Sequence, residues 1–373
     1  MIERALDQIT LADIEALVTY RRSEGATLDF KEAFPPGDHK GVRDFLADVT
    51  AFANTDGGDI IVGLREDKNG TAQEIVGIDK AGLDEGLRRI DDQLRSCIDP
   101  RVPLFRVQEI AWRGDKVVLI MRVGASLIAP HRVVYEKSSR FYRRANRGNF
   151  EMSTAEIRQA FAASADLPEK VRDLHHKAVV AIGGKDMPCR IHDRPTLIVT
   201  VAPLSVLRKA RDVRITRDNA VMPPDPMGGI DWIVGLDGLI VIANREEQGA
   251  RAWSVNHRRG YLDFAWAIGR LADGQKIIWP KYVVDHLPGA VRSTTTILRS
   301  VGVEGPWIVM ASVTGLKDFR LIMSDHHWTD AAWQDSAYLG EIIDDAMSED
   351  SLQPLVEGFW RLFGVENPPR PQR

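Results

Sequence analysis

The sequence lacks most features by which a class of protein is recognised at first sight. Its two cysteines, Cys97 and Cys189, are too few for a disulfide framework or a four-cysteine zinc site. No stretch approaches eighteen uncharged apolar residues, so we expect no membrane-spanning helix and no membrane partner. The N-terminus has neither the positive start nor the unbroken apolar run of a signal peptide. We therefore expect a cytoplasmic protein.

Several catalytic and nucleotide-binding signatures are also missing. The chain contains no Walker A sequence, no G-x-G-x-x-G turn after a strand, no G-x-S-x-G and no H-E-x-x-H. Their absence argues against a standard P-loop ATPase, Rossmann dehydrogenase, α/β-hydrolase or zincin. A large net charge is missing too, since 49 Lys and Arg oppose 53 Asp and Glu. The balance of -4 excludes a globally basic protein but leaves a local basic surface open.

The length and composition are those of a globular protein with two or three domains. The 373 residues are 44% hydrophobic and 27% charged. Tryptophan is unevenly distributed, because Trp112 stands alone in the first half and the others lie beyond residue 230. This shift predicts two separately built cores. We place the domains at 1–165 and 185–365, with a flexible tail over 366–373.

The first domain is predicted to mix helices and strands. Asp38 can cap a helix that ends near Asn54, and further helices are predicted at 80–98 and from Ser153 to about 163. The predicted strands lie at 27–31, 59–64, 74–78, 104–112 and 116–123, followed by a shorter pair near 133–145. We expect an α+β fold, with a mixed sheet and flanking helices. The glycine pair at 57–58 follows a helix, so it should serve a turn and not a phosphate.

The second domain is predicted to be smaller and of the α/β or α+β class. Its predicted elements are strands at 196–204 and 307–316, a hairpin at 232–244, a strand or helix at 261–269, and helices at 335–347 and 351–363. Its tryptophans are expected to pack in the core and in interfaces. An exposed sheet edge in either domain could support a homo-oligomer.

Acidic residues gather around two predicted strands of the first domain. Glu24 and Asp29 lie five residues apart at the start of one strand, and Glu66 and Asp67 directly follow another. If the strands pair, these carboxylates converge. Two or three convergent carboxylates can hold Mg²⁺ or Mn²⁺ for phosphodiester cleavage. The alternative is a set of solvated turn acids.

Basic residues gather in one segment of the same domain. Residues 132–147 contain six basic side chains and one acid, a local charge of +5. In a strand, Arg140, Tyr142 and Arg144 would share one face and Arg143 would lie on the other. Arginine binds phosphate bidentately and aromatic rings stack on unpaired bases, which favours contact with nucleic acid. The alternative is a solvated edge strand whose charges prevent aggregation.

Three separated blocks of the first domain occur in an order that resembles the Schlafen/AlbA-type DNA-binding family. They are EGATLDFKE at 24–32, DVTAFANTDGGDIIVGLRED at 48–67 and SSRFYRRANRGNFEMSTAEI at 138–157. The resemblance covers about residues 20–163. The second half is similar to the poorly characterised region that follows this domain in some bacterial proteins.

The resemblance implies a nucleic-acid-binding protein with a regulatory role, whose partner is DNA or RNA. The residues implied in binding are Lys31, Arg140, Tyr142, Arg143, Arg144 and Arg147. It also implies an alternative, a nuclease whose ligands to Mg²⁺ or Mn²⁺ are Glu24, Asp29 and Glu66, with Asp67 as a further catalytic candidate. Asp29 stands where the family usually has Glu. An older grouping with ATPases adds ATP binding as a third alternative.

Overall fold

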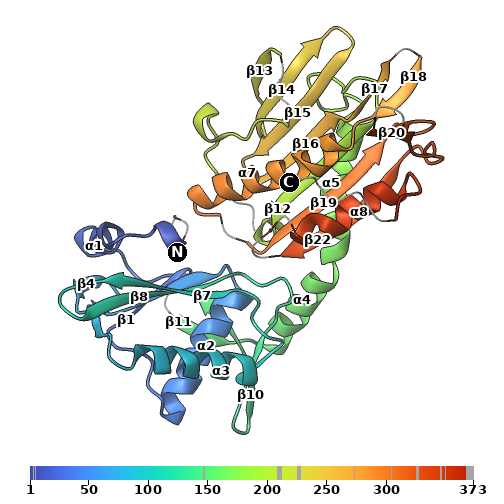
Figure 1. The fold of residues 1–373 in the computed structure, drawn as a ribbon. Helices are drawn as coiled ribbons and strands as arrows, with labels where there is room; N and C mark the ends of the chain where they lie inside the picture. The colour runs from blue at the N-terminus through green and yellow to red at the C-terminus, as the bar shows by residue number, and fades with distance from the viewer. Residues whose placement is uncertain are drawn as a thin grey trace. The chain divides into compact units, whose positions relative to one another are not determined.

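The computed structural model divides the chain into two compact units, which we describe separately (Figure 1). Unit 1 contains Met1–Leu167 and Gly302–Gly305, and unit 2 contains Pro168–Val301 and Pro306–Arg373. The structure describes residues 1–366 except 3, 5, 146–147, 208–211, 225–227, 273, 304, 325–326, 345–346 and 349. Nearly all of the predicted tail therefore lies outside the described residues.

Unit 1 is built on a mixed five-stranded sheet. Its strands are β1 (Leu28–Lys31), β2 (Gly58–Val62), β8 (Lys116–Val123), β5 (Ile78–Asp79) and β7 (Phe105–Ala111). β1 and β2 run parallel, and the other pairs are antiparallel. The predicted mixed sheet is therefore confirmed.

Helices cover both faces of this sheet. On one face, α2 (His39–Asn54) and α3 (Leu83–Cys97) share an apolar core cluster with β2 and β8. On the other face, η1 (Leu6–Gln8) and α1 (Leu11–Thr19) pack against β1, β2 and β8. The Asp38 side chain accepts a hydrogen bond from the third residue of α2, so the predicted cap is confirmed.

A second, four-stranded antiparallel sheet packs against the same α2. Its order is β11 (Gly148–Glu151), β10 (Ser138–Ala145), β9 (Arg132–Tyr135) and β6 (Ile98–Asp99). It leads into α4 (Thr154–Ala165), which opens with the predicted capping box. A separate two-stranded ribbon, β3 (Leu64–Glu66) with β4 (Ala72–Ile75), follows the end of β2.

The predicted role of the glycine pair after α2 is confirmed. Gly57 has a φ of +71°, and a Cβ there would lie 2.7 Å from the carbonyl oxygen of Val123. A Cβ on Gly58 would lie 2.3 Å from the ring of Phe52. Both positions need glycine for backbone geometry and close packing.

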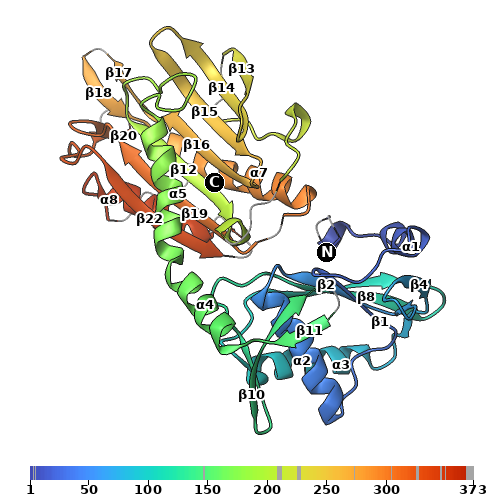
Figure 2. The same ribbon diagram turned by 180° about the vertical axis from the view of Figure 1, so that it is seen from behind.

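Unit 2 is built on a seven-stranded antiparallel sheet. The strand order is β13 (Ile230–Val234), β14 (Gly238–Glu246), β15 (Gly249–His257), β16 (Tyr261–Ala267), β12 (Thr196–Pro203), β19 (Trp307–Thr314) and β22 (Ala337–Asp344). One face of the sheet is covered by α5 (Leu167–Ala181), which lies in front of the sheet in Figure 2. The other face carries α7 (His286–Ser300) and α8 (Gln353–Arg361), seen in front in Figure 1.

A smaller sheet and short helices complete unit 2. The sheet contains β17 (Gly269–Ala272), β18 (Gln275–Ile278), β20 (Arg320–Ser324) and β21 (His327–Trp328). The short helices are η2 (Leu204–Leu207), η3 (Arg217–Asn219), α6 (Lys281–Val284) and η4 (Asp350–Leu352). Among the described residues, no helix is long and apolar enough to cross a membrane.

Most predicted elements of unit 2 are confirmed, with one clear error. The segment 335–347, predicted to be helical, contains the strand β22, because it completes a backbone ladder along β19. Gly340 within it has a φ of +127°, which a helix does not allow. The ambiguous segment 261–269 contains the strand β16, and α5 was not predicted. Unit 2 also spans more residues than unit 1, contrary to the expected smaller domain.

Candidate functional site

The basic strand β10 presents two different faces. Tyr142 packs against the core cluster of α2, and the guanidinium of Arg144 lies 4.7 Å from the ring centroid of Phe52. Arg143 lies on the opposite face, directly across from Phe150 of β11. The predicted alternation of side chains along this strand is confirmed.

The prediction that Arg144 is an exposed phosphate ligand is wrong. Its side chain is only 2% exposed, and its Nη2 lies 2.7 Å from Oδ1 of Asp29. The guanidinium also donates to the backbone oxygens of Gly25 and Leu28 and to the side-chain oxygen of Asn149. A phosphate would have to displace these acceptors from a side chain that solvent hardly reaches.

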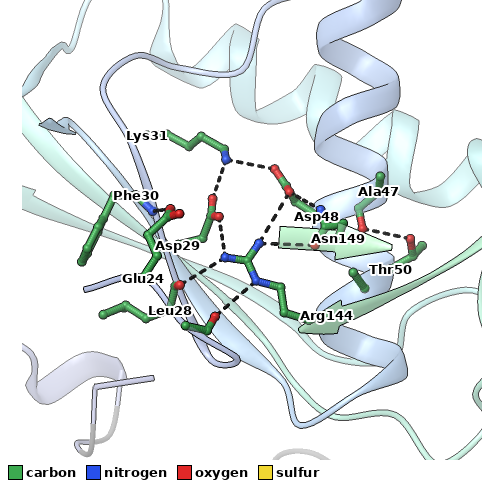
Figure 3. Close-up of polar contacts among 12 residues, drawn as sticks. Glu24, Leu28, Asp29, Phe30, Lys31, Ala47, Asp48, Thr50, Arg144 and Asn149 are labelled. Atoms are coloured by element: carbon green, nitrogen blue, oxygen red, sulfur yellow. Dashed lines mark hydrogen bonds and ion pairs between the residues drawn. The ribbon is translucent and has the colours of Figure 1, made fainter. Parts of the chain in front are cut away.

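Arg144 belongs to a cluster of four charged side chains, drawn in Figure 3, which we call the buried cluster although its Lys31 side chain is 38% exposed. Asp29 and Lys31 come from β1, Asp48 from α2 and Arg144 from β10. The Lys31 ammonium lies 2.6 Å from Asp29 and 3.3 Å from Asp48. Asn149 of β11 donates to Asp48. Two carboxylates thus face two cations, which makes the quartet neutral and offsets part of the cost of burying it.

The pKa values follow from this arrangement. Burial alone would raise the pKa of Asp29, but the charges of Lys31 and Arg144 outweigh it and the pKa is lowered. The pKa of Asp48 is raised to about 6 by burial and by the charge of Asp29. Burial alone would lower the pKa of Lys31, but the charges of Asp48 and Asp29 outweigh it and the pKa is raised. Asp29 and Lys31 therefore stay charged at neutral pH, and their ion pairs with Asp48 and Arg144 connect β1 to α2 and β10.

Glu24 lies at the edge of this cluster and ionises with difficulty. One of its carboxylate oxygens accepts from the backbone N–H of Phe30 at 2.7 Å. Its pKa is raised to about 7, first by burial, then by the charge of Asp29, with a further contribution from Glu66. The pKa of Glu66 is raised by burial and by the charge of Asp29. The charge of Asp29 therefore acts on both Glu24 and Glu66.

Asp67 has a different role. It accepts from the backbone N–H groups of Asn69 and Thr71 and pairs with Arg21. These contacts, led by the bond from Asn69, lower its pKa. Asp67 therefore organises the turn between β3 and β4, and Glu66 is the residue that faces Glu24.

A divalent cation fits poorly among these acids. The Asp29 carboxylate already binds two cationic side chains, Lys31 and Arg144. Within the described part of the chain, no group of three or more His, Cys, Asp or Glu is arranged to hold a metal ion. Lys31 and Arg144 already neutralise the carboxylate of Asp29, so these residues do not fit a divalent metal ion.

A cavity of about 610 Å³ adjoins the buried cluster. Its lining includes Lys31 and Tyr142, two of the residues predicted to bind nucleic acid. Lys40 is the second cation of the lining, and three carboxylates, those of Asp38, Asp44 and Asp48, oppose the two lysines. A polyanion would meet this negative charge, and the Lys31 ammonium is already held by two acids. The cavity therefore does not favour phosphate.

The exposed arginines lie instead on the sheet formed by β9, β10 and β11. Arg132, Arg140 and Arg143 keep 44%, 54% and 41% of their side-chain surface exposed. Each pairs with an acid that is also exposed, namely Asp99, Glu151 and Glu156. Such pairs contribute little stability, about 0–1 kcal/mol, so a phosphate can displace them at small cost. Arg147 lies outside the described residues.

Strand register sorts these arginines onto two faces. Arg132 pairs with Phe141, and Arg143 pairs with Phe150, so all four side chains share the face turned away from α2. Val134 lies on the same face and is 40% exposed. We call these five residues the outer sheet face. Arg140 alternates onto the opposite face, with Tyr142.

Sequence reasoning missed one member of the buried cluster, Asp48, and its hydrogen-bond partner Asn149. A usable signal for Asp48 exists, because it lies within one turn of Phe45 and Phe52 on the apolar side of α2. A carboxylate in that position is costly unless a cation pairs with it. Asn149 carries no comparable signal, since its role depends on the register of β11 against β10.

Comparison with known proteins finds one family match, which lies within unit 1. Residues 24–153 match the family model described as Schlafen, AlbA_2. The match stops before unit 2 begins.

Two solved structures are similar to part of the chain. The N-terminal domain of a RecG-related protein from Nitrosomonas europaea is 24% identical, with a TM-score of 0.27, over 35% of this chain and 82% of that one. The DIP2311 protein from Corynebacterium diphtheriae is 21% identical, with a TM-score of 0.29, over 41% of this chain and 33% of that one. No curated protein matches the chain.

Proposed function

We propose that the N-terminal domain binds nucleic acid through phosphate contacts on the outer sheet face. The observation that carries this proposal is the placement of Arg132 and Arg143 on one exposed face, each paired with an acid that solvent also reaches. Arginine forms bidentate, charge-assisted hydrogen bonds with phosphate. The family match, and the three sequence blocks that resemble DNA-binding relatives, support the same function.

The salt dependence of binding tests this proposal. Phosphate contacts release counterions, so affinity should fall steeply as salt rises. In fluorescence anisotropy with a labelled oligonucleotide, the double variant Arg132→Gln, Arg143→Gln should reduce the slope of log affinity against log salt by about two. Wild-type affinity that stays flat from low to moderate salt would contradict the proposal.

Arg140→Gln is the matched control. Arg140 lies on the same strand and pairs with an exposed acid, as Arg143 does, but its side chain is on the opposite face. A simple loss of positive charge would affect both variants equally. Binding by the outer sheet face predicts that Arg143→Gln weakens binding much more than Arg140→Gln.

A metal-dependent nuclease is the second candidate. One observation supports it: the carboxyl groups of Glu24, Asp29 and Glu66 interact and the pKa values of Glu24 and Glu66 are raised. The pairing of Asp29 with Lys31 and Arg144 opposes it. Cleavage that requires Mg²⁺ or Mn²⁺, and that Glu24→Ala abolishes while binding survives, would support this candidate. Cleavage that a chelator leaves unchanged would contradict it.

A further inference from the structure

An aromatic surface accompanies the arginines of the outer sheet face. Phe150 is 50% exposed, and the guanidinium of Arg143 lies 5.8 Å from its ring centroid. Phe161 of α4 is 54% exposed and meets Phe141 edge to face at 6.2 Å. Phe141 precedes Arg143 by two positions in β10, so the rings and the guanidinium form one continuous row.

The row is informative because its exposed rings are contiguous, and contiguous exposed apolar surface often marks a binding site. Large side chains such as Phe gain about 1.5–3 kcal/mol when they are buried. Phe150 and Phe161 are about half exposed within unit 1, so they obtain only part of this stabilisation. Rings that lie open to solvent beside arginines are suited to a ligand that offers both flat apolar faces and negative charge.

We propose that the outer sheet face binds single-stranded nucleic acid, with an unpaired base stacked on Phe150 and its phosphate on Arg143. This inference rests on the proposed function and specifies the ligand. An unpaired base supplies an open π-face for the ring, and its phosphate supplies the charge for the guanidinium. In a duplex the base faces are already stacked on one another, and proteins reach only the base edges from the grooves. A ring on a broad sheet face therefore gains contact only with unpaired bases.

The geometry also assigns different roles to neighbouring residues. Glu156 holds the Arg143 guanidinium at 2.6 Å beside Phe150, so the arginine is already placed next to the stacking ring. Phe161 extends the row from α4 and offers a position for a second base. Arg132 lies across from Phe141 and offers a second phosphate contact. Two bases and two phosphates can thus lie along one line of side chains.

The test compares a single-stranded oligonucleotide with a hairpin duplex of the same composition, in both RNA and DNA form, by fluorescence anisotropy. Phe150→Ala should weaken single-strand binding about 5- to 150-fold, the range measured for base–aromatic stacking. Its salt slope should stay unchanged, because no phosphate contact is lost. Phe150→Leu should weaken binding nearly as much, since it keeps apolar bulk but has no aromatic face. Tyr20→Ala, which removes another exposed ring of unit 1, should have no effect.

The outcomes separate this inference from the proposed function. If the chain binds neither probe, the proposed function itself fails. If it binds both probes equally and Phe150→Ala changes nothing, phosphate binding stands and base stacking is overturned. If Phe150→Ala and Phe161→Ala change only the oligomeric state, measured by light scattering, the face binds a second copy of the chain and the inference is overturned. A preference for the single strand that Phe150→Ala removes supports it.

Discussion

Replacing Glu24 by glutamine should stabilise unit 1 at alkaline pH and have almost no effect in acid. The pKa of Glu24 is raised from 4.5 to about 7 by burial and by the charge of Asp29. A carboxyl whose folded pKa is raised contributes stability that is full below pH 4.5 and is lost as the pH rises through 7. Glutamine does not ionise, so the variant avoids that loss.

The magnitude follows from the same rise in pKa. A change from 4.5 to about 7 corresponds to at most ~3 kcal/mol of unfavourable ionisation. Part of Glu24 is in contact with solvent, so we expect about 1–2 kcal/mol at pH 8.5. The amide oxygen of glutamine can still accept the bond from the Phe30 N–H, so the substitution preserves the local backbone contact.

Amide hydrogen exchange in β2 and β8 measures this prediction, because it reports unit 1 separately from unit 2. Protection of these strands should increase in Glu24→Gln at pH 8.5 and match the wild type at pH 4. Asp67→Asn provides the control of opposite sign, because backbone N–H groups lower the pKa of Asp67 and its charge stabilises the fold above its ordinary pKa. Loss of protection in Glu24→Gln at pH 8.5 would refute the reasoning, since the ionised carboxylate would then be favourable.

Three further predictions follow from other parts of the structure. Arg144→Met should destabilise unit 1 by about 3–5 kcal/mol, and adding Asp29→Asn should recover part of the loss, as denaturation of the single and double variants would show. Glu156→Gln should tighten oligonucleotide binding at low salt, because it frees Arg143; unchanged affinity in anisotropy would argue against a phosphate contact there. Burial lowers the pKa of His175 from 6.5 to about 4, so unit 2 should lose at most about 3–4 kcal/mol of stability as the pH falls from 6.5 to about 4. Tryptophan fluorescence reports that unit, and a flat pH profile would contradict the prediction.

The elements of unit 1 were largely predictable because local patterns determine them. The apolar period of α2, the Asp38 cap and the capping box of α4 depend on residues a few positions apart. The errors in unit 2 have the opposite cause. The segment 335–347 forms a strand because it pairs with the edge of β19. The residues of the segment alone do not indicate that this partner exists. A helix pattern and a strand pattern compete in short apolar runs, and the tertiary neighbour decides.

The site was predictable in its residue types but not in their roles. The spacing of Glu24 and Asp29, and the acids that follow β2, predicted a convergence of carboxylates. In the structure the charges of Asp29 and Glu66 both raise the pKa of Glu24, and the predicted site itself stays a prediction. The same reasoning could not separate Glu66 from its neighbour Asp67. That difference depends on which side chain turns toward β1 and which caps the β3–β4 turn.

The sequence by itself determined that one segment of unit 1 carries an excess of arginine, that its side chains alternate and that acids lie near two strands. Only the tertiary structure decided what those charges do. Arg144 turns inward to neutralise Asp29, while Arg132, Arg140 and Arg143 each meet an acid from another strand or from α4. Charge counted along a chain is a sum over neighbours in sequence. Electrostatic energy depends on neighbours in space and on burial, so a +5 segment became one buried ion-pair cluster and one exposed row of arginine and phenylalanine.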